Sequence, residues 1–380
     1  MIRGKDKARL TTGQPGGEIE DPREFGWGRF FRIFKKRQHP EEERTIVDYL
    51  EKSGKVERDR YAVITPDGKL NRMRTGISTR VGERHEFKDK GDEDFALYYR
   101  RPDLGSLSII ADGLGESRTA GEDSSIAALS FYEFMRDTMS KPEAARRYVE
   151  KNPGGRNVVR VDKMIKDAMR YANDNVAENG KEKGNEKPGT TFTALLLGKT
   201  GKAMVAHVGD SRLYLVDENG RAFQITSDQG ERSQVWHMMG RVDEDYFRVY
   251  DVDRQLASLR EEKPGQNIPE RYDAKKHTLI VCSDGISNYI AGWNEKGAFD
   301  VHRAVQAYRD ELKGEDSEDA QAESLSYIIR PHLKNAQGMA DALVDAARRA
   351  SIEITGSSYA KQGEIYGDDM SVIVKRPFLT

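Results

Sequence analysis

Five short acidic motifs stand at the ends of apolar runs, and this arrangement constrains the chain more than any other feature. The runs at 107–111, 203–208 and 278–282 are typical of short buried strands, and each leads to an aspartate beside a glycine. The last motif instead precedes the strand-like run 370–374. The motifs are GDED at 91–94, ADG at 111–113, GDSR at 209–212, SDG at 283–285 and GDD at 367–369. The pattern predicts carboxylates at the points where strands begin or stop.

Carboxylates that converge on one place repel each other unless a cation neutralises them. Mg²⁺ and Mn²⁺ prefer oxygen ligands, and a glycine beside an aspartate lets a backbone carbonyl approach as a further ligand. Two such ions roughly 3.5 to 4 Å apart activate a shared water and hold a phosphoryl group. A single Asp-Gly is typical of a turn. The hypothesis of a metal site for phosphoester hydrolysis therefore depends on the whole set.

The order of the motifs resembles that of the metal-dependent serine/threonine phosphatases known as the PPM or type 2C family, in a bacterial-like variant. The resemblance covers roughly residues 75–376 and implies an α+β fold, in which a central sandwich of two antiparallel β-sheets is flanked by helices in four α-β-β-α layers. Helical patterns at 120–139, 160–178 and 339–355 fit that architecture. The matching motifs are Glu93-Asp94, Asp112-Gly113, Gly189-Thr190-Thr191, Gly209-Asp210-Ser211-Arg212, Ser283-Asp284-Gly285 and Asp368-Asp369-Met370-Ser371.

The resemblance also implies a metal-binding site and a reaction. Asp112 would bridge two Mn²⁺ or Mg²⁺ ions, and the nucleophile would be a water held between the metals rather than a serine or cysteine. The substrate would be phosphoserine or phosphothreonine in a phosphoprotein. The other ligands that the resemblance implies are the Gly113 carbonyl, Glu93 or Asp94, Asp284, Asp368 and, for an additional third ion at a weaker position, Asp210.

Some positions depart from the family pattern. Leu114 follows Asp112-Gly113, where many members have a histidine that acts as general acid, so a water would have to protonate the leaving group. Asn288 stands where the family usually has an aspartate for the third metal, and Asp369 replaces the usual asparagine. The third metal site is the position that these changes affect most.

The family also places an arginine shortly before the acidic pair, where it holds the substrate phosphate. In this chain the stretch 79–94 contains an insertion relative to that pattern. Arg84 is the candidate for the phosphate-binding role, with Arg80 as the alternative.

Composition favours a water-soluble enzyme without naming its reaction. The 62 basic and 64 acidic residues leave a formal net charge of −2, which gives no electrostatic reason to expect nucleic-acid binding. No apolar stretch approaches the 18 or so residues of a transmembrane segment, and the N-terminus lacks the apolar centre of a signal peptide. These features predict a cytoplasmic location.

The chain is expected to divide into an N-terminal extension at 1–70 and a phosphatase domain at 71–380. Residues 1–24 are charged, glycine-rich and poor in apolar residues, which predicts disorder. The segment 25–37 mixes aromatic and basic residues. It could pack on the catalytic domain as a short helix, or it could dock on a partner or an anionic membrane surface. The run 61–73 has the pattern of a hairpin.

Two further residues invite a functional interpretation. Cys282 directly precedes the SDG motif, but a lone cysteine in a strand is more simply explained as a small buried hydrophobic residue. His237 lies in the segment 227–250, where the family has a variable flap near its active site. A packed or surface role for this histidine is favoured over contact with the substrate.

Two rival functions remain open. The first is a catalytically inactive PPM-fold protein that serves as a regulatory or binding module, although the acidic set, which lacks a carboxylate only at Asn288, argues against it. The second is another two-metal phosphoester hydrolase, such as a nuclease or a nucleotide hydrolase. Comparing a nucleotide with a phosphopeptide as substrate discriminates between the active alternatives.

Overall fold

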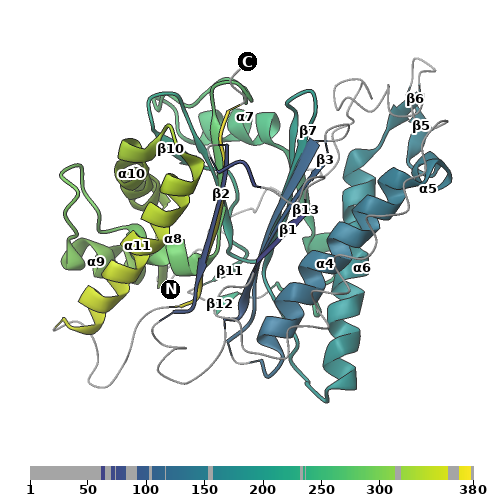
Figure 1. Ribbon diagram of the computed structural model, residues 1–380, viewed down its shortest axis with the longest axis horizontal. Helices are drawn as coiled ribbons and strands as arrows, with labels where there is room; N and C mark the ends of the chain where they lie inside the picture. Colours follow the sequence, from purple (N-terminus) through teal and green to yellow (C-terminus); the bar gives the residue numbers. More distant parts are fainter. Residues whose placement is uncertain are drawn as a thin grey trace, which may run out of the picture.

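Two β-sheets face each other, and helices cover the outer face of each sheet (Figure 1). This arrangement confirms the predicted α+β sandwich with four layers. The computed structural model describes residues 61–64, 70–72, 74–82, 92–101, 105–115, 117–152, 157–231, 234–235, 237–312, 318–357 and 368–377.

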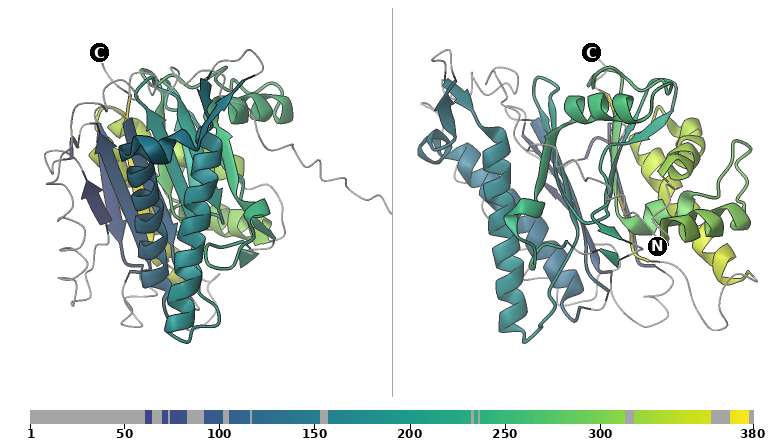
Figure 2. Two further views of the ribbon diagram at one scale, coloured as in Figure 1. Left: turned by 90° about the vertical axis from the view of Figure 1, so that its right-hand side faces the viewer. Right: turned by 180° about the vertical axis from the view of Figure 1, so that it is seen from behind.

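The first sheet has six strands, and helices α4 (Ala120–Ser140) and α6 (Val161–Glu182) lie side by side on its outer face (Figure 2). Neighbouring strands are antiparallel except that the edge strand β1 runs parallel to β3. The strands, in spatial order, are β1 (Tyr61–Ile64), β3 (Asp94–Arg101), β4 (Gly105–Asp112), β7 (Phe192–Gly198), β8 (Ala203–Val208) and β13 (Arg248–Asp251).

The second sheet has five strands, all antiparallel to their neighbours. Its outer face is covered by α8 (Asp284–Ile290), α10 (Glu318–Ile329) and α11 (Ala336–Thr355), whose buried side chains form one apolar core with the sheet. The strands, in spatial order, are β10 (Ala222–Gln224), β9 (Arg212–Val216), β14 (Thr278–Cys282), β15 (Met370–Lys375) and β2 (Thr75–Arg80).

Apolar periodicity explains how the layers adhere. Helix α6 presents one face to the first sheet because its buried residues recur every three or four positions, from Val161 to Val176. Strands β7, β8, β14 and β15 are buried along their whole length, since one face meets the helices and the other meets the opposite sheet. Ile110, Val281 and Ile373 belong to the core between the sheets.

Further elements complete the described part of the fold. They are α5 (Pro142–Arg146), β5 (Val149–Lys151), β6 (Asn157–Val159), β11 (Gly230–Glu231), β12 (Gln234–Val235), the 3₁₀ turn η1 (Glu244–Tyr246), α7 (Val252–Glu262), α9 (Val301–Leu312) and the 3₁₀ turn η2 (Arg330–His332). Among the helices that the structure describes, none is both long and apolar enough to span a membrane.

The three helices predicted at 120–139, 160–178 and 339–355 are confirmed as α4, α6 and α11. The predicted hairpin at 61–73 is wrong, because β1 pairs with β3 in the first sheet whereas β2 belongs to the second. Two neighbouring segments with strand-like patterns can each pair with a strand far away in the chain. The local pattern does not reveal which partner a strand takes. Residues 61–64, which we assigned to the N-terminal extension, therefore form part of the first sheet. The aromatic and basic segment 25–37 lies outside the described residues.

Candidate metal centre

Strand pairing brings the predicted carboxylates to one end of the two sheets. Asp94 is the first residue of β3 and lies directly opposite Asp112, the last residue of β4. In the second sheet, Asp284 follows β14 and Asp368 precedes β15, and these two strands are antiparallel neighbours. Each sheet therefore contributes two aspartates from a pair of adjacent strand ends.

The proximity of these carboxylates affects their electrostatics. Burial raises the pKa of Asp112 well above its ordinary value, and the negative charges of Asp94, Asp284 and Asp368 raise it further. The interaction of Asp112 with the Asp284 side chain acts in the same direction. Repulsion of this kind is what a bound cation would relieve.

The carboxylate of Asp94 shows most directly that a cation fits. Its side chain is 0% exposed, and neither oxygen has a hydrogen bond of normal geometry among the described residues. Burial raises the pKa of Asp94, as do the charges of Asp369 and Asp368, while the nearby hydroxyls of Ser283 and Ser371 lower it. A buried carboxylate that lacks adequate donors is stabilised by a metal ion, and Mg²⁺ and Mn²⁺ prefer such oxygens.

The ligand oxygens are not spread around a common centre. Within the described part of the chain, no three acidic, histidine or cysteine side chains are already arranged as a metal-binding group. The donor set suits divalent ions in number and chemistry.

The position of Gly113 cannot accept a larger residue. A Cβ atom there would lie 2.4 Å from the carbonyl oxygen of Ala120 and 2.8 Å from that of Glu93. The Gly113 amide donates to the Glu93 carbonyl at 3.1 Å, and that carbonyl also accepts from the Ser124 hydroxyl at 2.7 Å. The backbone that would offer the Gly113 carbonyl as a ligand is thus fixed against the acidic pair.

The Gly-Thr-Thr motif holds the backbone of Asp112. The Thr190 hydroxyl and the Thr191 amide both donate to the Asp112 carbonyl at 2.8 Å. The Asp112 amide in turn donates to the Thr191 hydroxyl at 3.1 Å, and that hydroxyl lies 2.7 Å from the hydroxyl of Ser211. Sequence reasoning matched this motif to the family without giving it a role. Its contacts show that it fixes the backbone of Asp112, a predicted ligand.

The GDSR motif has a structural arginine. Arg212 is 1% exposed, and its guanidinium donates to both carboxylate oxygens of Asp228, at 3.0 and 2.6 Å, and also to Gln321. It therefore joins β9 to the loop after β10 and to α10. Asp210 lies in the bend after β8, and it is not among the main influences on the pKa of Asp112 or Asp94. Its role as an additional ligand stays a prediction.

Asn288 and Asp369, the two departures beside the second sheet, both make specific contacts. The Asn288 amide donates to Asp284 at 3.0 Å, so this residue orients a predicted ligand. Asp369 is buried, and its two carboxylate oxygens accept the backbone amides of Gly82, at 2.8 Å, and of Glu93. Asp369 thereby ties the end of β2 and the acidic pair to the start of β15. Sequence reasoning had seen only added negative charge at this position.

Replacing Asp369 with asparagine should lower the free energy of unfolding by about 1–3 kcal/mol, because the amide group would face a buried N–H donor and leave it unpaired. Urea unfolding measures the change. The matched control is Asp345→Asn on the exposed side of α11, which should shift stability by less than about 0.5 kcal/mol. Equal stability of the two variants would contradict the two-acceptor role.

Of the two candidates for the phosphate-binding arginine, the structure describes only Arg80. Arg84 lies outside the described residues. Arg80 ends β2 opposite Met370, two positions from Asp368, and its Nε atom is buried with no hydrogen bond among the described residues. The backbone of Arg80 is thus close in register to Asp368, and its phosphate-binding role stays a prediction.

The remaining candidates have packing roles. Cys282 is fully buried in β14, and burial raises the pKa of its thiol to about 12. This confirms the interpretation as a buried hydrophobic residue. His237 stacks on Tyr246, with ring centroids 3.6 Å apart, and burial lowers its pKa. The surrounding segment reaches the metal centre through backbone instead, since Met239 pairs with Thr190.

The fold and the site together define the class of protein: an α-β-β-α sandwich with an acidic centre where strands of both sheets end. The sequence profile of protein phosphatase 2C matches residues 81–326, well over half of the chain. The chain therefore belongs to the protein phosphatase 2C family, as the resemblance predicted. Direct comparison with curated proteins finds no significant match.

Solved structures of bacterial phosphatases resemble this chain at low sequence identity. PppA, described as a key regulatory component of T6SS in Pseudomonas aeruginosa, is 17% identical with a TM-score of 0.47, and 80% of this chain and 97% of that chain are covered. The S. agalactiae serine/threonine phosphatase is 15% identical with a TM-score of 0.49, over 80% and 99% of the chains. The catalytic domain of PstP, in complex with 2 manganese ions, is 19% identical with a TM-score of 0.44, over 79% and 96%.

Proposed function

We propose that this chain is a Mn²⁺- or Mg²⁺-dependent protein serine/threonine phosphatase. The observation that carries the proposal is the meeting of Asp94, Asp112, Asp284 and Asp368 at adjacent strand ends, where the charges of the other three raise the pKa of Asp112. A cluster of mutually repelling buried carboxylates costs folding free energy, so its presence in a member of this family favours a metal-binding function. Membership of the family supplies the reaction class.

Asp112, Asp284 and Asp368 would hold the ions, together with the Gly113 carbonyl and Glu93 or Asp94. When bound, divalent ions supply the nucleophilic water and the positive charge that phosphoester hydrolysis needs. The protein's own contribution is rigid placement. Gly-Thr-Thr fixes the Asp112 backbone, Asn288 orients Asp284, and Asp369 fixes the acidic pair. Asp210 stays our proposal for an additional third ion.

Substrate binding and proton transfer fall to other residues. Arg84 or Arg80 would pair with the substrate phosphate, because a guanidinium matches two phosphate oxygens. Leu114 follows the Gly113 ligand, and its backbone amide donates to the Gly189 carbonyl at 3.0 Å. An apolar side chain at this position has no proton to give, so a water would protonate the leaving serine or threonine.

The alternatives differ in what they would bind. An inactive binding module would fold without turning over any phosphoester. A different two-metal hydrolase would prefer nucleotides to phosphopeptides. We further propose a cytoplasmic location, a phosphoprotein as the substrate, and docking of segment 25–37 on a partner, on a membrane surface or back on the domain.

The test is hydrolysis of p-nitrophenyl phosphate, a phosphothreonine peptide and ATP by the purified chain, with Mn²⁺, with Mg²⁺ and with EDTA. We expect turnover of the first two substrates with either metal and none with EDTA, because the carboxylates require ions to form the site. Added Mn²⁺ in excess over EDTA should restore the rate. Folded protein without turnover would favour the binding module, and preferential hydrolysis of ATP would favour a nucleotide hydrolase.

A further inference from the structure

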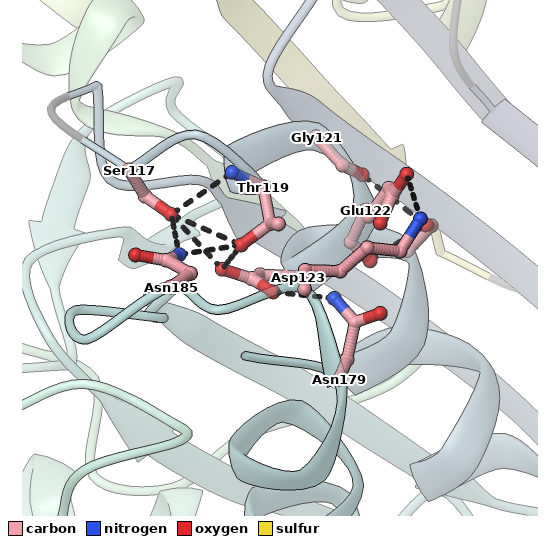
Figure 3. A network of polar contacts seen from close by, with 9 residues as sticks. Ser117, Thr119, Gly121, Glu122, Asp123, Asn179 and Asn185 are labelled. Atoms are coloured by element: carbon pink, nitrogen blue, oxygen red, sulfur yellow. Dashed lines mark hydrogen bonds and ion pairs between the residues drawn. The ribbon is translucent and has the colours of Figure 1, made fainter. Parts of the chain in front are cut away.

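A second buried aspartate, Asp123, lies near the metal centre without belonging to it. It is in the first turn of α4, and its side chain is 0% exposed. Figure 3 shows it at the hub of a network of polar contacts that joins three separate parts of the chain. The motifs matched in the sequence analysis do not include this residue, and the reaction proposed above assigns it nothing.

Four donors converge on the Asp123 carboxylate. One oxygen accepts from the Thr119 hydroxyl at 2.8 Å, the Gly189 amide at 3.0 Å and the Ser117 hydroxyl at 3.2 Å. The other oxygen accepts from the Asn179 amide at 3.1 Å. A buried carboxylate that accepts this many hydrogen bonds needs no metal ion, which distinguishes Asp123 from Asp94.

A second amide reinforces the same loop. The side chain of Asn185 donates to the hydroxyls of Ser117 and Thr119, at 2.8 and 2.7 Å (Figure 3). Asn179 and Asn185 both lie around the C-terminal end of α6. The hydrogen bonds therefore fix Ser117 and Thr119 against the end of a long helix that is itself packed on the first sheet.

The network contacts two backbone segments that lie next to Asp112. Ser117 and Thr119 follow Asp112 and Gly113 closely in the chain, so fixing them restricts the carbonyl that Gly113 would offer as a ligand. Gly189 begins the Gly-Thr-Thr segment, in which Thr190 and Thr191 hold the Asp112 backbone. Asp123 thus links both backbone segments that flank the predicted bridging ligand.

We propose that Asp123 is a positioning residue that sets the metal affinity of the site. It would do so by holding Ser117 and Thr119, which follow Gly113, in a fixed position relative to the Gly-Thr-Thr segment. The inference rests on the proposed function. Asp123 would act indirectly, through the positions of other residues. It contacts the backbone amide of Gly189 and the side chains of the loop rather than any predicted ligand.

The test compares Mn²⁺ binding by the full chain and its variants, measured by electron paramagnetic resonance of free Mn²⁺, alongside p-nitrophenyl phosphate hydrolysis. Asp123→Ala should weaken Mn²⁺ binding about 10–100-fold, the usual effect of losing a group that orients metal ligands. At saturating Mn²⁺ the hydrolysis rate should largely recover. Asp123→Asn should bind Mn²⁺ nearly as the parent chain does, because its amide oxygen can accept three of the bonds and a rotated Asn179 amide can accept the fourth.

Glu122→Ala is the matched control. Glu122 lies in the same turn of α4, but its side chain is exposed and pairs with Lys183 at the surface. Its removal should leave Mn²⁺ binding unchanged. If Asp123→Ala does not fold, Thr119→Val removes one donor at nearly constant volume and should weaken binding in the same direction by a smaller factor.

The outcomes separate this inference from the proposed function. A parent chain that hydrolyses phosphate esters, combined with an Asp123→Ala variant that binds Mn²⁺ normally, would overturn the positioning role alone. Equal weakening by Asp123→Ala and Asp123→Asn would overturn it as well, because geometry would then not be the cause. A parent chain that binds Mn²⁺ without hydrolysing any ester would overturn the phosphatase, while weaker binding by Asp123→Ala would still support the positioning role.

Discussion

Replacing Asp112 with asparagine should lower metal-dependent hydrolysis by more than about 100-fold, beyond the usual effect of losing a group that only orients a ligand. Asp112 is the predicted bridging ligand, and three other carboxylates act on its pKa from close by. An amide has one neutral oxygen where the carboxylate has two charged ones, so affinity for both ions falls together. Initial rates with p-nitrophenyl phosphate across a Mn²⁺ titration measure the effect.

The same substitution should not destabilise the metal-free protein. In EDTA the charges of Asp94, Asp284 and Asp368 oppose ionised Asp112, and a neutral amide removes that repulsion. Urea unfolding in EDTA should therefore give a midpoint equal to or above that of the parent chain. A variant that keeps most of its activity would refute the bridging assignment, and a variant that loses stability in EDTA would show that the carboxylate has a structural role instead.

Replacing Gly285 with alanine should damage both the fold and the metal centre. A Cβ atom at this position would lie 1.9 Å from the carbonyl oxygen of Asp369, where backbone cannot yield as a flexible side chain would. The start of α8 must then move away from β15 and take Asp284 with it. We expect a loss of about 3 kcal/mol in the free energy of unfolding, at the upper end of the usual cost of overpacking.

Gly356→Ala is the matched control for this change. Gly356 follows α11, and a Cβ atom there would meet nothing closer than 3.5 Å, which is ordinary contact. Urea unfolding of the two variants should show a large loss for Gly285→Ala and a small change for Gly356→Ala. Mn²⁺ binding should fall only in the first. Normal Mn²⁺ binding by Gly285→Ala would mean that Asp284 does not depend on the close approach of α8 to β15.

Local sequence pattern was enough to predict much of this fold. Helix α6 is recognisable because its apolar residues recur with helical spacing, and β14 because a short apolar run ends at Ser283. Periodicity of this kind depends only on neighbours in the chain. The partner of a strand depends on distant residues, which is why the segment at 61–64 was mistaken for part of a hairpin and proves to be an edge strand beside β3.

The candidate site divides in the same way. The motifs identified Asp112, Asp284 and Asp368 as predicted ligands, because a carboxylate at the end of a strand can be recognised in the sequence. The residues that hold these carboxylates or their backbone in place could not be recognised in this way. Asp369 accepts the amides of residues more than 270 positions away, and Asp123 gathers donors from a loop, a helix end and the Gly-Thr-Thr segment. No short pattern encodes contacts over such separations.

The sequence by itself thus determined the class of fold, the family and the carboxylates that would bind metal, since all three depend on residue types beside short apolar runs. Only the tertiary structure decided which strand ends meet, that Arg212 is buried against Asp228, and which groups Asp369, Asn288 and Asp123 contact around the candidate centre. The physical reason is that a hydrogen bond depends on where two atoms lie in space, and for residues far apart in the chain only the packing of the sheets and helices determines that.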